Sequence, residues 1–162
     1  MTILFDPTEQ MLIACAVKEV VFLNFQTGVI QPKKGTNWMK YGGQQTVLCG
    51  IYMGSTLITG VFNGSLLEWK GNSISQAWKA HDGPCNALYS WRSTPGFISG
   101  GKDGQVIVWT DKFERQKVIN LKEPSVNSYT PQAISVCENE AGNKILVGTR
   151  GGEIIEFTDK KS

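Results

Sequence analysis

The chain has few of the residues on which catalysis and metal binding usually depend. It contains one histidine, His81, and four cysteines without CxxC spacing. It has no G-x-S-x-G, P-loop or H-E-x-x-H motif. A Cys–His hydrolase could use only His81 with Cys85, and their spacing across a loop-to-strand boundary gives no reason for them to meet. We therefore expect a protein that is not an enzyme and that needs no cofactor or metal.

Strong net charge and long apolar runs are also missing. The formal net charge is +2 with 19% charged residues, too near neutral for the basic face of a nucleic-acid-binding domain. No run is apolar enough to cross a bilayer, and the first residues lack the features of a secretory signal. Cysteines without a pairing pattern fit a reducing compartment. These absences predict an intracellular protein that binds neither nucleic acid nor membrane.

No segment shows a long helical spacing of apolar residues, but one hairpin pattern occurs three times, at residues 58–69, 98–109 and 146–157. Its turn glycines, Gly64, Gly104 and Gly152, are 40 and 48 residues apart (104 − 64 and 152 − 104). A period in this range indicates stacked supersecondary units. The repetition favours a binding platform over an enzyme.

Each repeat has the chemistry of a tight hairpin closed by a large ring. The turn dipeptides predict two-residue type I′ turns, which need positive φ at both positions; they are Asn63-Gly64, Asp103-Gly104 and Gly151-Gly152. The flanking residues are β-branched, aliphatic or aromatic. Each hairpin ends in Trp69, Trp109 or Phe157, and we expect these rings to fill the gaps between neighbouring sheets.

The remaining apolar runs complete a four-stranded unit. Residues 46–52, 85–89 and 133–137 read as innermost strands, and residues 74–78 and 116–121 as outermost strands. A weaker copy of the hairpin, without the glycine, occupies residues 12–25. Four short strands at this period are the signature of a β-propeller blade. We divide the chain into blades at 1–36 (partial), 37–80, 81–122 and 123–162 (partial).

Three to four blades are fewer than most closed propellers contain. We therefore expect an all-β, incomplete arc of four-stranded antiparallel blades. An open arc leaves strand edges and sheet faces without partners. The missing blades would come from the rest of a longer chain or from a partner.

One blade contains a set of polar residues that resembles the WD-repeat pattern. His81 lies before an inner strand, Ser99 on the next strand, Asp103 in the tight turn and Trp109 one strand on. In that family these four side chains are joined by hydrogen bonds that brace the blade. The resemblance implies a structural role for the set. The neighbouring repeats depart from it, with Asn63 and Gly151 in place of the aspartate.

A longer resemblance covers roughly residues 12–158. The stretch Gly71-Asn72-Ser73-Ile74-Ser75-Gln76-Ala77, followed by Ala80-His81-Asp82-Gly83, is similar to the echinoderm microtubule-associated protein-like (EMAP-like) family, in the later blades of its first propeller. The resemblance implies a non-enzymatic scaffold that binds tubulin or microtubules through propeller loops, in the cytoplasm, the cytoskeleton or cilia. A WD-repeat scaffold of another system (ciliary transport, a ubiquitin ligase or RNA processing) would have the same fold.

The acidic surface of tubulin favours basic loops, and aromatic residues beside cations are typical of contact hot spots. The candidate contacts are Lys33, Lys34, Trp38, Lys40 and Tyr41, with Lys112 and Arg115 as further cations. We expect Trp38, Tyr41, Trp91 and Tyr129 to be exposed in loops. The alternative interpretation is that the Trp38–Tyr41 loop packs back over a neighbouring blade.

Overall fold

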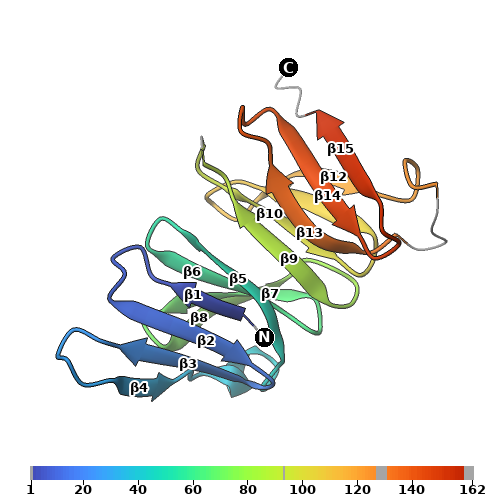
Figure 1. Cartoon of the computed structure of the whole chain (residues 1–162). Helices are drawn as coiled ribbons and strands as arrows, with labels where there is room; N and C mark the ends of the chain where they lie inside the picture. The colour runs from blue at the N-terminus through green and yellow to red at the C-terminus, as the bar shows by residue number, and fades with distance from the viewer. Residues whose placement is uncertain (1, 93, 127–130, 159–162) are drawn as a thin grey trace.

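The computed structural model describes residues 2–92, 94–126 and 131–158. Figure 1 shows four antiparallel sheets that fan out in an open arc, with the first and the last sheet at opposite ends. The only helical element in these ranges is the 3₁₀ turn η1 (Trp38–Tyr41). The prediction of an all-β, incomplete propeller arc is confirmed. The described residues include no helix long and apolar enough to cross a membrane.

Each sheet is built from strands that follow one another in the chain, as in a propeller blade. The first sheet contains β1 (Thr2–Phe5), β2 (Met11–Ala16), β3 (Glu19–Asn24) and β4 (Gln31–Lys34). The second contains β5 (Val47–Met53), β6 (Thr56–Val61), β7 (Ser65–Lys70) and β8 (Ser73–Lys79). The third contains β9 (Cys85–Ser90), β10 (Phe97–Gly101), β11 (Gln105–Trp109) and β12 (Arg115–Asn120). The fourth contains β13 (Ala133–Glu138), β14 (Lys144–Thr149) and β15 (Ile154–Thr158).

The inner strands line up beside one another along the arc. β5 lies against β1 on one side and β9 on the other, and β9 in turn lies against β13. The runs predicted as inner strands coincide with β5, β9 and β13, and those predicted as outer strands coincide with β8 and β12. The first sheet has four strands, whereas the sequence pattern located only β2 and β3. The division into blades at residues 36, 80 and 122 stays a prediction.

Three apolar layers form the core, one between each pair of neighbouring sheets. Ile13 and Phe22 of the first sheet meet Leu67 and Trp69 of the second. The same arrangement joins the second sheet to the third, and the third to the fourth. Alternate residues of a strand point to opposite faces, so each inner sheet contributes to two layers. Each sheet therefore depends on its neighbours to bury its apolar faces.

The rings that end the hairpins lie in these layers. Trp69 packs edge-on against Trp38, with ring centroids 5.4 Å apart, and Trp109 stacks on Phe97 at 5.7 Å. Phe157 packs against the layer between the third and fourth sheets. Burying an aromatic ring removes a large apolar area from water, which favours this position for the largest side chain of each repeat.

The tight turns differ from the predicted type I′ geometry. In each turn the glycine has a positive φ, 86° at Gly64 and 83° at Gly152, whereas the residue before it does not. The N–H of Gly64 donates to the carbonyl of Val61 at 2.9 Å, and β7 begins at the next residue. This is a three-residue loop, a type I turn followed by one left-handed residue. In such a loop the left-handed glycine forms a β-bulge, which adds to the twist of the strands. One residue with positive φ is therefore enough to close the hairpin.

Two of these glycines form a matched pair for a stability test. A Cβ on Gly64 would lie 2.1 Å from the carbonyl oxygen of His81, whereas a Cβ on Gly152 would meet nothing within 4 Å. Both substitutions place alanine at a similar positive φ, which costs about 1–2 kcal/mol. We expect Gly152→Ala to lower the free energy of unfolding by about this amount and Gly64→Ala by at least about 2 kcal/mol more, because backbone has to move. Urea denaturation measures both, and equal losses would contradict the assigned contact.

Candidate functional site

The predicted contact segment begins on the exposed outer strand of the first sheet. Lys33 and Lys34 lie on β4, and both are exposed. The Nζ of Lys34 is 2.6 Å from a carboxylate oxygen of Glu19 on β3. Glu19 therefore partly neutralises the charge of Lys34, which makes Lys33 the better candidate for an ionic contact with a partner.

The aromatic residues of this segment are less exposed than predicted. Trp38 is only 6% exposed, so the prediction of an exposed Trp38 is wrong. Its indole Nε1 donates to the carbonyl of Gly35 at 3.0 Å, and its ring packs against Trp69. Tyr41 is half-buried, and its hydroxyl donates to the carbonyl of Ser75 on β8. The loop packs back over the second sheet because the gap beside Trp69 offers apolar contacts.

Two cations and two other rings complete the predicted contacts. Lys40 is exposed, with its Nζ 5.4 Å from the centre of the Tyr41 ring. Trp91 is half-buried against the layer between the third and fourth sheets, so the prediction that it is exposed is also wrong. Tyr129 lies outside the described residues. Lys112 is exposed in the loop after β11, far along the chain from Lys33.

The set that resembles the WD-repeat pattern forms one hydrogen-bonded chain. The Nδ1 of His81 lies 3.1 Å from Oδ1 of Asp103, and its Nε2 lies 2.8 Å from the hydroxyl oxygen of Ser99. The indole Nε1 of Trp109 donates to the same hydroxyl oxygen at 2.8 Å. His81, Ser99 and Trp109 are buried. Together they tie the loop before β9 to three other parts of the third sheet.

Asp103 forms the least buried end of this hydrogen-bonded set, with its side chain 11% exposed. Its carboxylate accepts the backbone N–H groups of Asp82 and Gln105, at 2.9 Å and 3.1 Å. Burial on its own would raise the pKa of Asp103, but the hydrogen bond and charge of His81 and these two N–H groups outweigh it. The pKa therefore lies below the ordinary value of 3.8.

The second sheet contains half of this arrangement. Thr59 occupies the place of Ser99, and the indole of Trp69 donates to its hydroxyl at 2.9 Å. Asn63 stands where Asp103 does, and it accepts the N–H of Ser65 at 2.9 Å. In the fourth sheet Val147 and Phe157 replace the serine and the tryptophan, so this hydrogen bond cannot form there. The full set of His81, Ser99, Asp103 and Trp109, named here the polar brace, is found in the third sheet.

His81 and Cys85 do not form a catalytic pair. Both ring nitrogens of His81 already have partners in Asp103 and Ser99. The thiol of Cys85 is buried beside Cys49, with 4.0 Å between the two sulfurs. The interaction with Cys49 and burial raise the pKa of Cys85, which is the opposite of what an activated nucleophile needs. No group of three potential metal ligands occurs in the part of the chain that the structure describes.

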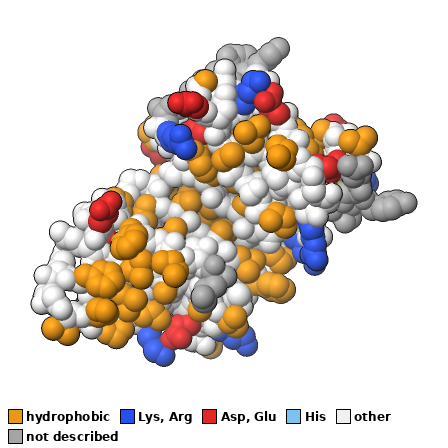
Figure 2. Space-filling view, in the orientation of Figure 1, with side chains coloured by type: hydrophobic (Ala, Val, Ile, Leu, Met, Phe, Trp, Pro, Cys, Tyr) orange, Lys and Arg blue, Asp and Glu red, His pale blue; other side chains and the backbone are white. Residues whose placement is uncertain are grey.

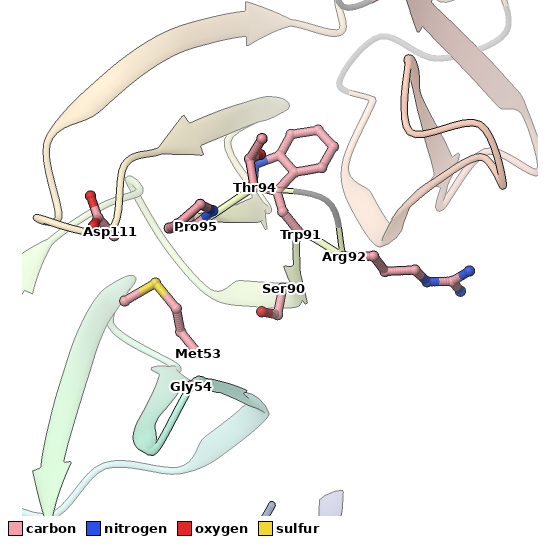
Figure 3. A pocket seen from close by; sticks show the side chains of 9 residues that line it. Met53, Gly54, Ser90, Trp91, Arg92, Thr94, Pro95 and Asp111 are labelled. Atoms are coloured by element: carbon pink, nitrogen blue, oxygen red, sulfur yellow. The ribbon is translucent and has the colours of Figure 1, made fainter.

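One open pocket of about 450 Å³ lies between the second and third sheets (Figure 3). Its lining comes from the end of β5 and the turn after it (Met53, Gly54), from the loop after β9 (Trp91, Arg92) and from the loop after β11 (Asp111). In Figure 3 the Arg92 side chain extends away from the other labelled residues. The lining has hydroxyl, carboxylate and guanidinium groups but no imidazole or thiol. Such a lining suits binding better than nucleophilic chemistry.

A second hollow contains residues that sequence reasoning missed. It lies between β8 and the β11–β12 loop and is lined by Lys112 and Arg115, together with Trp78 and Phe113. The two cations stand out in the sequence, but nothing in it shows that Trp78, more than thirty positions earlier, lies beside them. The hollow is considered further below.

The shared position of Ser99 and Thr59 gives a test of the polar brace. Ser99→Ala removes the hydroxyl that accepts from the indole of Trp109 and pairs with Nε2 of His81. Because two buried polar groups lose their partner, we expect a loss of about 1–3 kcal/mol in the free energy of unfolding. Ser99→Thr keeps the hydroxyl that works in the second sheet and should lose much less. Denaturant unfolding of the two variants measures the difference, and equal losses would show that the hydroxyl is unimportant.

The lowered pKa of Asp103 predicts a dependence on pH. A carboxyl with a depressed folded-state pKa stabilises the fold above its unfolded value of about 3.9, and this contribution disappears as the pH falls through the folded value. We expect Asp103→Asn to lower Tm at neutral pH and to reduce the further fall in Tm below about pH 4. Thermal unfolding from pH 7 to pH 3 measures this; parallel curves for the two proteins would contradict it.

Known proteins that are similar in sequence to this chain agree with the propeller geometry described above. Echinoderm microtubule-associated protein-like 2 of Mus musculus is 27% identical over 93% of this chain and 23% of its own length. The 77 kDa echinoderm microtubule-associated protein of Strongylocentrotus purpuratus is 30% identical over 90% of the chain and 22% of its own length. Echinoderm microtubule-associated protein-like 1 of Homo sapiens is 29% identical over 95% and 19%, respectively.

The chain thus spans about a fifth of the length of these curated relatives. No family model matches it. The similarity nevertheless runs through almost the whole chain, and the sheets have the order and the inner-strand contacts of propeller blades. These similarities support an assignment of the chain to the EMAP-like family, with a WD-repeat propeller fold.

Proposed function

We propose that this chain is a non-enzymatic, protein-binding scaffold that associates with tubulin or microtubules in the cytoplasmic cytoskeleton. The observation that supports this most is the similarity, over nine-tenths of the chain, to proteins named as microtubule-associated. The fold agrees with it, because a propeller holds its loops on a rigid frame where binding residues commonly lie. The loops and outer strands provide cations, of which Lys33 and Lys40 are exposed.

Lys33 gives the cleanest charge test of this function. Lys33→Glu reverses an exposed charge without breaking the ion pair between Lys34 and Glu19. We expect microtubule co-sedimentation at low salt to weaken about threefold for Lys33→Glu, and about tenfold when Lys34→Glu is added. Raising the salt concentration should shrink both differences.

Lys122→Glu is the matched control, because it changes the net charge equally at another exposed position. Its co-sedimentation should stay close to that of the unaltered chain. Unchanged binding of the Lys33 and Lys34 variants would remove this strand from the interface. Absence of any pelleting by the unaltered chain would contradict the proposed function.

We also infer that further blades, from a longer chain or a partner, cover the free face of the first sheet. Ile3 and Phe5 on β1 are 61% and 60% exposed, and Figure 2 shows hydrophobic side chains gathered over this sheet. The opposite face of the same sheet is buried against the second. An apolar sheet face without a partner favours association.

The free face predicts how the chain behaves alone. We expect it to self-associate in size-exclusion chromatography with light scattering, and Phe5→Lys to shift it towards monomer. Val17→Lys is the control, since Val17 is 74% exposed in the β2–β3 turn. A monodisperse monomer with a sharp unfolding transition for the unaltered chain would contradict the inference.

A further inference from the structure

The hollow between the second and third sheets, named here the rim groove, lies on the outer side of the arc. It is formed by β8, the outermost strand of the second sheet, and the loop that joins β11 to β12. Its lining includes Trp78 and Lys79 from β8, and Lys112, Phe113 and Arg115 from the loop and the start of β12. The volume is about 380 Å³, enough for one or two side chains of a partner.

The apolar part of the rim groove consists of two aromatic rings that pack against each other. Trp78 and Phe113 have centroids 4.6 Å apart, and Phe113 also meets Phe97 edge-on at 6.1 Å. Phe113 has a φ of 62°, a left-handed conformation that a bulky residue rarely adopts. The loop therefore keeps this ring over Trp78 at a cost in backbone strain. Strain of this kind persists where surrounding contacts fix it, and it is common at binding sites.

The indole of Trp78 adds a hydrogen-bond donor without a partner. Its Nε1 is buried and has no acceptor among the described residues. A buried donor that has lost water and gained no partner costs about 1–3 kcal/mol. This unsatisfied donor, in the lining of the groove, favours a ligand with oxygen acceptors.

Three cations surround these rings. Lys79 and Lys112 are exposed, and the Nζ of Lys79 donates to the carbonyl of Asn63. Arg115 is fixed, because its Nη2 donates to the carbonyl of Lys79 at 2.9 Å and its guanidinium lies 5.5 Å from the Trp109 ring centre. None of the three forms an ion pair with a carboxylate in the described ranges. The nearby Asp111 lines the pocket of Figure 3 instead of this groove.

We propose that the rim groove binds an acidic peptide segment of a partner protein that presents an apolar or aromatic side chain among its carboxylates. The carboxylates lie against Lys79, Lys112 and Arg115, and the apolar side chain packs on Trp78 and Phe113. This proposal adds the chemistry of the partner segment to the proposed function. It rests on that function only for the expectation that the partner is tubulin.

Charge and size favour a peptide over a nucleic acid. A nucleic-acid strand needs a continuous basic track that neutralises many phosphates. The net charge here is +2, and the groove gathers three cations around one pair of rings. A short peptide with a single apolar side chain matches this arrangement better.

Fluorescence anisotropy with labelled peptides tests the proposal. The probe is a short glutamate-rich peptide with one central phenylalanine, compared with the same peptide carrying alanine at that place and with a lysine-rich counterpart. We expect the phenylalanine peptide to bind most tightly and the lysine-rich peptide not to bind. Lys112→Glu should raise the Kd of the first peptide roughly tenfold at low salt, since an attraction becomes a repulsion.

Phe113→Asn tests the ring separately from the charges. Asparagine tolerates the left-handed backbone, so the loop keeps its conformation while the aromatic surface is lost. We expect this variant to lose the preference for the phenylalanine peptide over the alanine peptide. Lys122→Glu, which reverses an exposed charge outside the lining of the groove, should leave peptide binding unchanged. Circular dichroism of each variant confirms that it is folded.

The outcomes distinguish this proposal from the proposed function. Binding of the acidic peptide that depends on Lys112 supports the groove even if the chain does not pellet with microtubules. Equal binding of acidic and lysine-rich peptides, or no effect of Lys112→Glu, would overturn it. Tighter binding of a single-stranded oligonucleotide than of the acidic peptide would overturn it as well.

Discussion

The packing of each sheet against its neighbours is the interaction on which the rest of this structure depends. The strands of the inner sheets are apolar on both faces, and three separate layers bury those faces. Between the second and third sheets the contact is so close that the sulfurs of Cys49 and Cys85 lie 4.0 Å apart. A Cβ on Gly60 would come within 3 Å of both sulfurs. Bulky side chains at this point would push the sheets apart and open the arc.

The polar brace in the third sheet works within this frame. Apolar layers fix the distance between sheets but do little to fix the loops at their ends, because the hydrophobic effect is not directional. Hydrogen bonds are directional, and the chain from Asp103 through His81 and Ser99 to Trp109 ties a loop, a turn and two strands together. The adjoining rim groove therefore has a rigid side formed by the third sheet. Arg115, which lies over Trp109, belongs to both features.

The candidate contacts show where sequence reasoning succeeded and where it failed. Charged residues such as Lys33 and Lys112 are exposed as expected, because an unpaired charge is costly to bury. Aromatic residues in loops are less predictable, since burial depends on whether a gap lies beside them. Trp38, in the turn η1, fills the gap next to Trp69, which lies on β7 more than thirty positions later. Its neighbours in the sequence give no sign of this contact.

The sequence by itself determined the repeating hairpins and the propeller fold, because these depend on local turn chemistry and on apolar runs that recur every 40 to 48 residues. The resemblance to the EMAP-like family rested on particular motifs, above all the stretch from Gly71 to Gly83. Even the four members of the polar brace stand out at their positions in the pattern. Only the tertiary structure decided which loop aromatics are buried, which turn type closes each hairpin and that Trp78 meets Phe113. The turn type depends on the twist of the two strands that the turn joins. Aromatic burial and the contact between Trp78 and Phe113 depend on how two sheets approach each other, and all the side chains between the sheets together set that distance.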